Sequence, residues 1–330
     1  MCGQPASGRA CIIPHAQFDK SMGGKVVCLV SEGTGNYSAR HARDGINLPA
    51  KIFESRRQHM ETHKSGQYFV IGKPIAHSLS PLIHNQALRE LGLEGTYSAR
   101  EVAVEELADF FAEFRSAHHA GCNITLPLKV AALSLVDEAS QRAQRLGAIN
   151  TLYWREGRLI GENTDVIGFR VPLEGKNFAH ALILGAGGVS RAAICALQEM
   201  QVKKITITNR SPEKAQALAE EFGIGCSPWE ERSGLEADLV INATSLGMKG
   251  EREDMTPYPL FRGTGLAYDI VYTPEKTRFL REAEAAGWQT QSGVAMFVEQ
   301  ARASFRLWTG LEMPKESAYT VVRTALAARS

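Results

Sequence analysis

This 330-residue sequence has no apolar run near the roughly 20 residues that a membrane-spanning helix needs. It also lacks an excess of one charge. Its 37 Lys and Arg residues against 36 Asp and Glu residues give a formal net charge of +1, so no global field attracts nucleic acid. The six cysteines are scattered without a pair at metal-ligand spacing, which is typical of reduced thiols. These absences favour a cytoplasmic protein whose partner is a small molecule, with no nucleic-acid, membrane or metal partner.

Residues 1–66 have little apolar sequence, with one convincing run from Val26 to Val30. A secretory signal would need a longer apolar core and a small-residue cleavage site, and neither is clear. The scarcity of acidic residues before Glu32 leaves an organellar transit peptide as an alternative. We expect a poorly ordered, dispensable extension, because too little apolar surface is present to offset the entropy of ordering. The exception is the run Val26 to Val30, which could dock as an edge strand on an open sheet.

The length of 330 residues and a hydrophobic content of 44% predict two domains. The second is organised around an apolar strand, Ala181 to Leu184, that runs into a glycine turn. Gly185 allows the sharp turn, Gly187 leaves room for a pyrophosphate, and a helix starting near Gly188 points backbone N–H groups at the same place. The glycines alone also suit a plain turn. Together the features predict a Rossmann-type dinucleotide-binding domain over residues 167–293.

The end of the next strand indicates which dinucleotide binds. A ribose-reading acidic residue would favour NAD at this point, but the sequence after Thr208 is Asn209-Arg210-Ser211-Pro212-Glu213-Lys214. Arg210 and Lys214 offer two cations to a 2′-phosphate, so we predict NADP. An alternative is a solvated helix start in which Ser211 is the N-cap and Pro212 the first helical residue. Both readings can hold together.

The first domain begins with a strand from Tyr68 to Gly72. Ser78 and Ser80 follow, and Ser80 is predicted to cap a helix whose first residue is Pro81. Two hydroxyls at a helix N-terminus make an anion site that could take a carboxylate, although capping and turn roles explain both serines equally well. His77 and His84 have no third metal ligand nearby, so we expect capping or packing roles for them.

A second polar group follows the strand that ends near Asn123. Asn123, Thr125 and Lys129 are expected to converge, before a predicted helix, at the carboxyl end of this strand, where open α/β sheets hold ligands. A hairpin then turns at Glu156-Gly157. Because paired strands bring their ends together, Asn150 and Asp165 can share one site.

Further elements complete the predicted fold. Strands are expected at 238–241, 266–272 and 289–291, with a helix from about Pro274, and the last helices, 294–308 and 315–328, should return to the first domain. The prediction is a two-domain α/β fold with ligands in the cleft between domains. Residues 67–166, completed by 294–330, form the substrate domain, and 167–293 form the NADP-binding domain.

From Tyr68 to the C-terminus the chain resembles the shikimate dehydrogenase family. The resemblance rests on five motifs that are specific in combination: Gly-x-Pro-Ile-x-His-Ser-x-Ser-Pro at 72–81, Asn-Ile-Thr-x-Pro-x-Lys at 123–129, Gly-Ala-Ile-Asn-Thr at 147–151, Asn-Thr-Asp at 163–165 and Gly-Ala-Gly-Gly at 185–188. It implies an oxidoreductase that uses NADPH to reduce 3-dehydroshikimate reversibly to shikimate, in aromatic amino-acid (chorismate) biosynthesis. Residues 1–66 have no recognised counterpart.

The resemblance also implies roles for single residues. Lys129 and Asp165 match the catalytic dyad. The residues that match substrate-binding positions are Ser78, Ser80, Thr125, Lys129, Asn150, Asp165, Tyr272 and Gln300. Those that match cofactor-binding positions are Gly185, Ala186, Gly187, Gly188 and Val189 at the pyrophosphate, Asn209, Arg210, Ser211 and Lys214 at the 2′-phosphate, and Thr244, Ile270 and Gly293 near the nicotinamide.

The residue types suit this chemistry, because reduction of a ring ketone needs a hydride and a proton for the developing alkoxide. Lys129 can stabilise that oxygen and donate the proton, and Asp165 can orient the amine. Two rivals remain: a quinate/shikimate dehydrogenase using NAD(P), and a ligand sensor without catalysis, which would need a DNA-binding module that residues 1–66 do not show. A monomer and a homodimer both fit the sequence.

Overall fold

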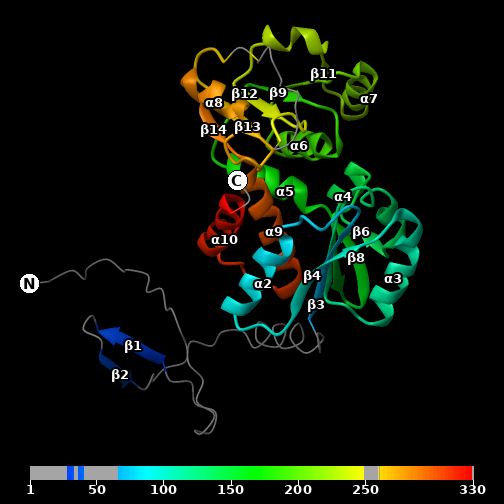
Figure 1. Cartoon of the computed structure of the whole chain (residues 1–330), viewed down its shortest axis with the longest axis vertical. Coiled ribbons are helices and arrows are strands. Elements are labelled where there is room, and N and C mark those ends of the chain that lie inside the picture. Colours follow the sequence, from blue (N-terminus) through cyan, green and yellow to red (C-terminus); the bar gives the residue numbers. More distant parts are fainter. Residues whose placement is uncertain (1–27, 33–35, 41–65, 249–258, 260, 329–330) are drawn as a thin grey trace, which may run out of the picture. The chain divides into compact units, whose positions relative to one another are not determined.

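The computed structural model describes residues 28–32, 36–40, 66–248, 259 and 261–328. Residues 1–58 and 59–330 form two separate units (Figure 1). In the first unit, β1 (Cys28–Glu32) pairs antiparallel with β2 (Asn36–Arg40) in a two-stranded sheet of its own. The predicted run Val26 to Val30 overlaps β1, and most of the predicted extension 1–66 lies outside the described residues.

The second unit begins with a six-stranded sheet in the order β4-β3-β5-β7-β8-β6. We call this sheet and its helices the first lobe. β3, β4 and β5 are parallel, β7 is antiparallel to β5 and β8, and β6 is parallel to β8. The strands are β3 (Gln67–Gly72), β4 (Thr96–Glu101), β5 (Gly121–Ile124), β6 (Glu138–Ala139), β7 (Thr151–Arg155) and β8 (Arg158–Glu162), and the helices α2 (Ser80–Glu90), α3 (Leu107–Ser116) and α4 (Gln141–Leu146).

Two separate apolar cores form around this sheet. In one core, Phe110 and Phe114 of α3 pack with Ile71 of β3. In the other, Tyr68 and Val70 of β3 pack with α2 and with two helices from the end of the chain, α9 (Gly293–Thr309) and α10 (Lys315–Ala327). The first lobe is therefore built from segments more than a hundred residues apart in the sequence.

The second lobe is a parallel six-stranded sheet in the order β11-β10-β9-β12-β13-β14. Counted along this lobe, the order is 3-2-1-4-5-6, which is that of the Rossmann fold and confirms the predicted fold class. The strands are β9 (His180–Leu184), β10 (Lys204–Thr208), β11 (Gly225–Cys226), β12 (Leu239–Asn242), β13 (Leu266–Asp269) and β14 (Gln289–Gln291), and the helices α6 (Gly188–Glu199), α7 (Pro212–Phe222) and α8 (Arg278–Ala285).

The two lobes are joined through α5 (Thr164–Arg170), which packs on both α9 and α6 (Figure 1). At the crossing of α5 and α9, a Cβ atom on Gly168 would lie 2.6 Å from the carbonyl oxygen of Met296 and 2.9 Å from the backbone nitrogen of Gln300. Only glycine allows the two helix backbones to approach this closely.

We expect Gly168→Ala to destabilise the protein by about 3 kcal/mol and to lower its thermal midpoint by about 5–10 °C, because the added methyl group would meet backbone atoms. Gly234→Ala is the matched control, since a Cβ there would make one ordinary contact of 3.5 Å. Differential scanning fluorimetry measures both midpoints. Equal midpoints for the two variants would contradict a tight crossing.

Three helix starts differ from the predicted ones. α2 begins at Ser80 with Leu79 as N-cap, so Ser80 lies inside the helix and does not cap it. The helix expected after Lys129 is a short 3₁₀ turn, Ala131–Leu135, because the chain then turns to pair with β8, with the N–H of Asp137 donating to Leu159 at 2.9 Å. The helix expected from Pro274 starts at Arg278, where Thr277 accepts the N–H of Leu280.

Candidate active site

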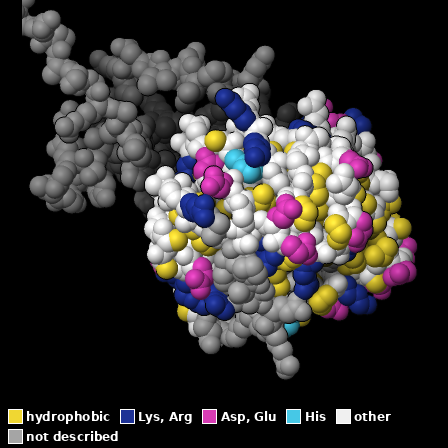
Figure 2. Space-filling view, turned by 90° about the horizontal axis from the view of Figure 1, so that it is seen from above, with side chains coloured by type: hydrophobic (Ala, Val, Ile, Leu, Met, Phe, Trp, Pro, Cys, Tyr) yellow, Lys and Arg dark blue, Asp and Glu magenta, His cyan; other side chains and the backbone are white. Residues whose placement is uncertain are grey.

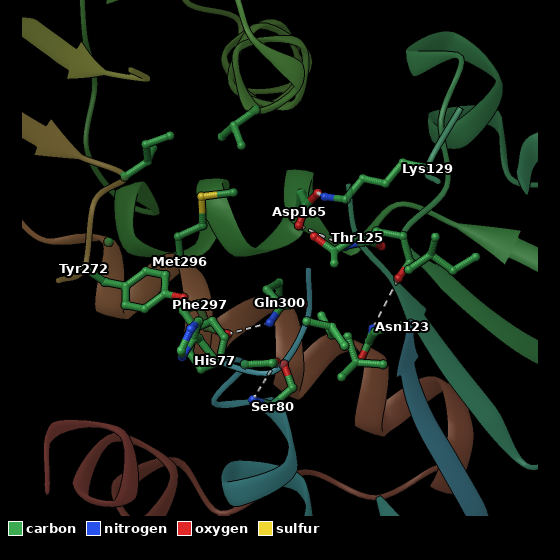
Figure 3. Close-up of a pocket in the computed structure, with 18 of the residues that line it drawn as sticks. His77, Ser80, Asn123, Thr125, Lys129, Asp165, Tyr272, Met296, Phe297 and Gln300 are labelled. Atoms are coloured by element: carbon green, nitrogen blue, oxygen red, sulfur yellow. Dashed lines mark hydrogen bonds and ion pairs between the residues drawn. The ribbon is translucent and has the colours of Figure 1, made fainter. Parts of the chain in front are cut away.

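A cavity of about 440 Å³ is lined by residues of both lobes (Figure 3). We call it the first cavity. All eight predicted substrate-binding residues line it: Ser78, Ser80, Thr125, Lys129, Asn150, Asp165, Tyr272 and Gln300. They come from the loop after β3, the start of α2, the segment after β5, the start of β7, α5, the loop after β13 and α9. Residues more than two hundred positions apart in the chain therefore share one cavity.

Lys129 and Asp165 form an ion pair at this cavity, with 2.6 Å between Lys129 Nζ and Asp165 Oδ2 (Figure 3). The other carboxylate oxygen, Oδ1, accepts a hydrogen bond of 2.9 Å from Asn150 Nδ2. Asp165 lies in the first turn of α5, where Asn163 accepts its backbone N–H at 3.2 Å. Because both oxygens have donors and the backbone is capped, the carboxylate is held in one orientation.

The hairpin β7–β8 places Asn150 beside Asp165 as predicted, since the N–H of Asn150 donates to Glu162 at 2.9 Å. The amide of Asn150 has only one possible orientation. Its oxygen accepts the backbone N–H of Thr164 at 2.7 Å and the hydroxyl of Thr151 at 2.9 Å, so its NH₂ group must face Asp165. The first cavity is therefore lined by a fixed row of one amide (Asn150), one carboxylate (Asp165) and one ammonium (Lys129).

A buried polar layer supports this row. The Nδ2 group of Asn123 donates to Ser304 Oγ of α9 at 2.9 Å and to Thr151 Oγ1 at 3.1 Å, while the Oδ1 atom of Asn123 accepts the hydroxyl of Tyr97 at 2.7 Å. Thr151 Oγ1 and Ser304 Oγ also share a hydrogen bond of 3.0 Å. Buried networks whose members are all bonded hold their geometry strongly, because breaking one bond leaves an unsatisfied group. The row is thus organised before any ligand binds.

The two serines lie where an anion is favoured. Ser80 is the first residue of α2 and is buried, and its backbone N–H donates to Ser78 Oγ at 3.2 Å. The positive end of the helix dipole and two hydroxyl groups therefore face the same cavity as Lys129. This arrangement can hold a carboxylate.

The first cavity also has residues that the sequence reasoning did not assign to it. His77, for which we expected a capping or packing role, lines it, and so do Met296 and Phe297 of α9. Phe297 accepts the Nε2–H of Gln300 at 2.8 Å, and its ring centroid is 5.3 Å from that of Tyr272. Met296 and Phe297 precede Gln300 by four and three residues, and this helical spacing is the signal that could have found them.

A second cavity, of about 350 Å³, lies at the carboxyl ends of the strands of the second lobe. Eight of the predicted cofactor residues line it: Gly185, Ala186, Gly187, Asn209, Arg210, Ser211, Lys214 and Thr244. Three others, Val189, Ile270 and Gly293, line the first cavity, and Gly188 is the first residue of α6. The predicted cofactor set therefore extends from the second cavity to the first.

The glycine turn has the geometry that a pyrophosphate needs. Gly185 has φ +108°, and a Cβ there would lie 2.9 Å from the carbonyl oxygen of Ala243. A Cβ on Gly187 would meet nothing within 4 Å, so the space beside its backbone is open. Ser190 fastens the turn, donating to Gly185 at 2.8 Å and accepting the N–H of Gly187 at 3.2 Å. The start of α6 can therefore receive a phosphate group.

Another group of residues that line the second cavity suits an additional phosphate. Arg210 and Lys214 are both exposed, and the described residues that line this cavity include no Asp or Glu. Ser211 is the N-cap of α7 and Pro212 its first residue, as predicted, although no side chain makes a capping hydrogen bond there. The residues present thus fit a 2′-phosphate and not an acid-bound ribose.

Asp269 is a buried carboxyl at the end of β13, beside Asn242 at the end of β12. It accepts the backbone N–H of Val271 at 2.9 Å, the amide of Asn242 at 2.9 Å and the hydroxyl of Thr277 at 2.5 Å. Asn242 in turn accepts the backbone N–H of Thr244 at 3.0 Å. Burial raises the pKa of Asp269 to about 7, and its three hydrogen bonds oppose that rise.

This raised pKa predicts a pH-dependent stability. The folded-state pKa of Asp269 is about 7, above the unfolded value of about 4. The stability that the protonated Asp269 carboxyl contributes is therefore fully present below pH ~4 and is lost as the pH rises through the folded-state pKa. Between pH 5 and pH 8, Asp269→Asn should gain about 3 kcal/mol in free energy of unfolding relative to the unchanged protein, because the amide stays neutral. Urea unfolding at both pH values measures this difference, and parallel pH profiles would contradict it.

Other features of the described residues concern metals, membranes and thiols. No group of three or more His, Cys, Asp or Glu residues in the described part is placed to hold a metal ion. None of its helices combines the length and apolar character needed to cross a bilayer. Cys122 and Cys195 are buried and Cys226 is exposed, all as free thiols.

On the face seen in Figure 2, acidic and basic side chains are interspersed.

Comparisons with known proteins agree on one family. Family models match at residues 70–152 (shikimate dehydrogenase substrate binding domain), 173–248 (shikimate / quinate 5-dehydrogenase) and 293–323 (shikimate 5′-dehydrogenase C-terminal domain). A shikimate dehydrogenase (NADP(+)) from Oleidesulfovibrio alaskensis is 46% identical over 266 residues, covering 79% of this chain and 95% of that protein.

Solved structures give the same result. Shikimate 5-dehydrogenase from Thermus thermophilus, in complex with NADP(H) and shikimate, is 43% identical with a TM-score of 0.71, covering 79% of this chain and 99% of that chain. Shikimate 5-dehydrogenase from Listeria monocytogenes, in complex with shikimate and NAD, is 32% identical with a TM-score of 0.73. The match covers 78% of this chain and 96% of that chain.

Proposed function

The chain belongs to the shikimate dehydrogenase family, and we propose that Lys129 and Asp165 are the catalytic dyad of its reaction. The protein is an NADP-dependent oxidoreductase that interconverts 3-dehydroshikimate and shikimate, a step of aromatic amino-acid biosynthesis. The observation that carries the dyad is the 2.6 Å ion pair in the first cavity, which is also lined by Val189 and Ile270 of the dinucleotide-binding lobe.

The reaction needs a hydride and a proton, and NADPH when bound supplies the hydride to the ring ketone carbon. The ammonium group of Lys129 stabilises the negative charge that develops on the ketone oxygen and then donates a proton to it. Asp165 holds that ammonium through Oδ2, and Asn150 holds Asp165 through Oδ1. In the reverse direction, the amine of Lys129 takes the proton from the substrate hydroxyl.

The other residues of the first cavity would position the ring. Ser78 and Ser80, at the positive end of α2, hold the substrate carboxylate. Thr125, Asn150, Tyr272 and Gln300 surround the ring hydroxyls. A substrate fixed at its carboxylate and its hydroxyls presents one carbon to the cofactor and one oxygen to Lys129.

The second cavity and its neighbours would hold NADP. The turn from Gly185 to Val189 would receive the pyrophosphate, and Asn209, Arg210, Ser211 and Lys214 would receive the 2′-phosphate. Thr244, Ile270 and Gly293 would lie near the nicotinamide. A Cβ on Gly293 would clash with the backbone carbonyl group of Ile270, so this position needs glycine. Residues 167–293 would then be the NADP-binding domain, and 67–166 with 294–330 the substrate domain.

Two further properties belong to this proposal. The balanced charge and scattered cysteines favour a cytoplasmic enzyme without a nucleic-acid or membrane partner. It would act as a monomer or a homodimer.

Initial rates with four pairs of reactants test the function: shikimate or quinate, each with NADP or NAD. We expect shikimate with NADP to give a kcat/KM at least about tenfold above every other pair, since Arg210 and Lys214 favour the 2′-phosphate. A higher value for quinate with NAD would favour a quinate dehydrogenase. Shikimate binding without any turnover would favour the sensor.

A further inference from the structure

One aromatic residue of the second cavity has no role in the function described so far. Trp229 lines this cavity, follows Pro228 and begins a short 3₁₀ helix, Trp229–Ser233. The indole is half-buried and packs against the apolar cluster that includes Leu246. A large flat ring therefore forms part of the wall of a cavity whose other groups suit phosphates.

The indole is fixed from one side. The guanidinium of Arg232 lies over the ring, with 4.2 Å from its central carbon to the ring centroid. The Nη1 group of Arg232 also donates to the carbonyl oxygen of Trp229 at 2.7 Å. Arg232 is 5% exposed, so this cation and the ring share a buried contact. One face of the indole is thus covered by Arg232, and Trp229 also lines the second cavity.

The other lining residues divide the cavity into parts. Gly185 and Gly187 form the phosphate turn, and Arg210 and Lys214 form the cationic side. Thr244 is assigned to the nicotinamide, so the remaining wall consists of Trp229, Ala243, Ser245 and Leu246. An adenosine with one phosphate at the glycine turn and another at the cations has its sugar between them, so its base must lie against this remaining wall.

We propose that Trp229 is the aromatic wall against which the adenine base of NADP packs, with Arg232 supporting the ring from behind. This inference rests on the proposed function, since it takes NADP as the occupant of the second cavity. Aromatic rings bind nucleobases by stacking because every base has a π-face, and a ring already held in place loses little entropy on binding. The adenine end of the cofactor thereby gains an anchor that is independent of the 2′-phosphate.

The test uses adenosine 2′,5′-bisphosphate, which has the base and both phosphates but no nicotinamide. Isothermal titration calorimetry compares its Kd in the unchanged protein and in Trp229→Leu, Trp229→Phe and Arg210→Ala. Leucine keeps apolar bulk but has no π-face, so we expect Trp229→Leu to raise the Kd by about tenfold. Phenylalanine keeps a ring and should stay within about threefold of the unchanged protein.

Fluorescence gives a readout that a merely structural role would not change. We expect the bisphosphate to quench tryptophan emission in the unchanged protein, and this quenching to be lost in Trp229→Phe although affinity remains. Trp154→Leu is the matched control, because Trp154 is half-buried in β7 and stacks on His118 in the first lobe. Its Kd should equal that of the unchanged protein. In Trp154→Leu, kcat at saturating NADP should stay within about twofold, because Trp154 lines neither the first nor the second cavity.

The outcomes distinguish a failure of this inference from a failure of the proposed function on which it rests. A Kd unaltered in Trp229→Leu, together with a large loss in Arg210→Ala, would overturn the role of Trp229 and leave the NADP site intact. No binding of the bisphosphate to the unchanged protein would overturn both. Equal losses in the leucine and phenylalanine variants would show that Trp229 only supports the fold of the loop, and would also overturn the inference.

Discussion

Replacement of Lys129 by alanine should lower kcat by about a thousandfold or more, with the Kd for NADP within about twofold of its original value. The loss is large because one group supplies both the proton and the charge that stabilises the developing alkoxide. NADP affinity should persist because Lys129 follows β5 in the first lobe and does not line the second cavity. Steady-state rates and calorimetric titration with NADP measure the two effects.

Lys176→Ala is the matched control for Lys129→Ala. Lys176 is exposed and bonds Gln289 at 3.0 Å, away from both cavities, so its loss should leave the rate unaltered. Asp165→Asn should also lower kcat, because a neutral amide cannot hold the ammonium group of Lys129 in place. Near-normal turnover of Lys129→Ala would rule out Lys129 as the proton donor.

Arg210→Ala should raise the KM for NADP by about ten- to a hundredfold and the KM for NAD by no more than about twofold. A charged hydrogen bond to the 2′-phosphate contributes about 1.5–3 kcal/mol, and NAD has no such phosphate. Lys214→Ala should show the same preference with a smaller effect, since Lys is a flexible point charge while Arg is a planar fork. Initial rates over a range of each cofactor give all four constants.

A cation elsewhere in the same lobe serves as the control. Arg191 of α6 pairs with Glu221 of α7 and lines neither cavity, so Arg191→Ala should leave both KM values unaltered. Equal losses with NADP and NAD in Arg210→Ala would show that Arg210 shapes the loop and does not contact the phosphate.

The parts of the site that sequence reasoning could predict depend on local pattern. The glycine turn at Gly185 and the hairpin that brings Asn150 to Asp165 follow from neighbouring residues and from the geometry of paired strands. The placement of Arg210 after β10 follows in the same way, because parallel strands end at a common edge of the sheet.

What could not be predicted depends on contacts between distant segments. Asn123 was expected to converge on the ligand edge, and it does line the first cavity, but its side-chain NH₂ group bonds inward to Ser304, 181 residues away. The segment after Lys129 has helical spacing, yet its pairing with Leu159 ends the turn early. Phe297 and Trp229 look like core residues in the sequence, because apolar type alone does not distinguish a core wall from a cavity wall.

The use of α9 and α10 in the first lobe has a consequence for synthesis on the ribosome. The apolar cluster around Leu182, Val240 and Trp288 lies within residues 182–288, so this core of the second lobe can form while later residues are still being translated. Tyr68 and Val70 must instead wait for Phe305 and Leu326, which are translated more than 200 residues later. A nascent chain stopped shortly after Trp288 would hold much of the cofactor-side core but expose the apolar face of β3 and lack Gln300. The core of the first lobe is therefore complete only after Leu326 has been translated, and until then its exposed apolar surface favours aggregation.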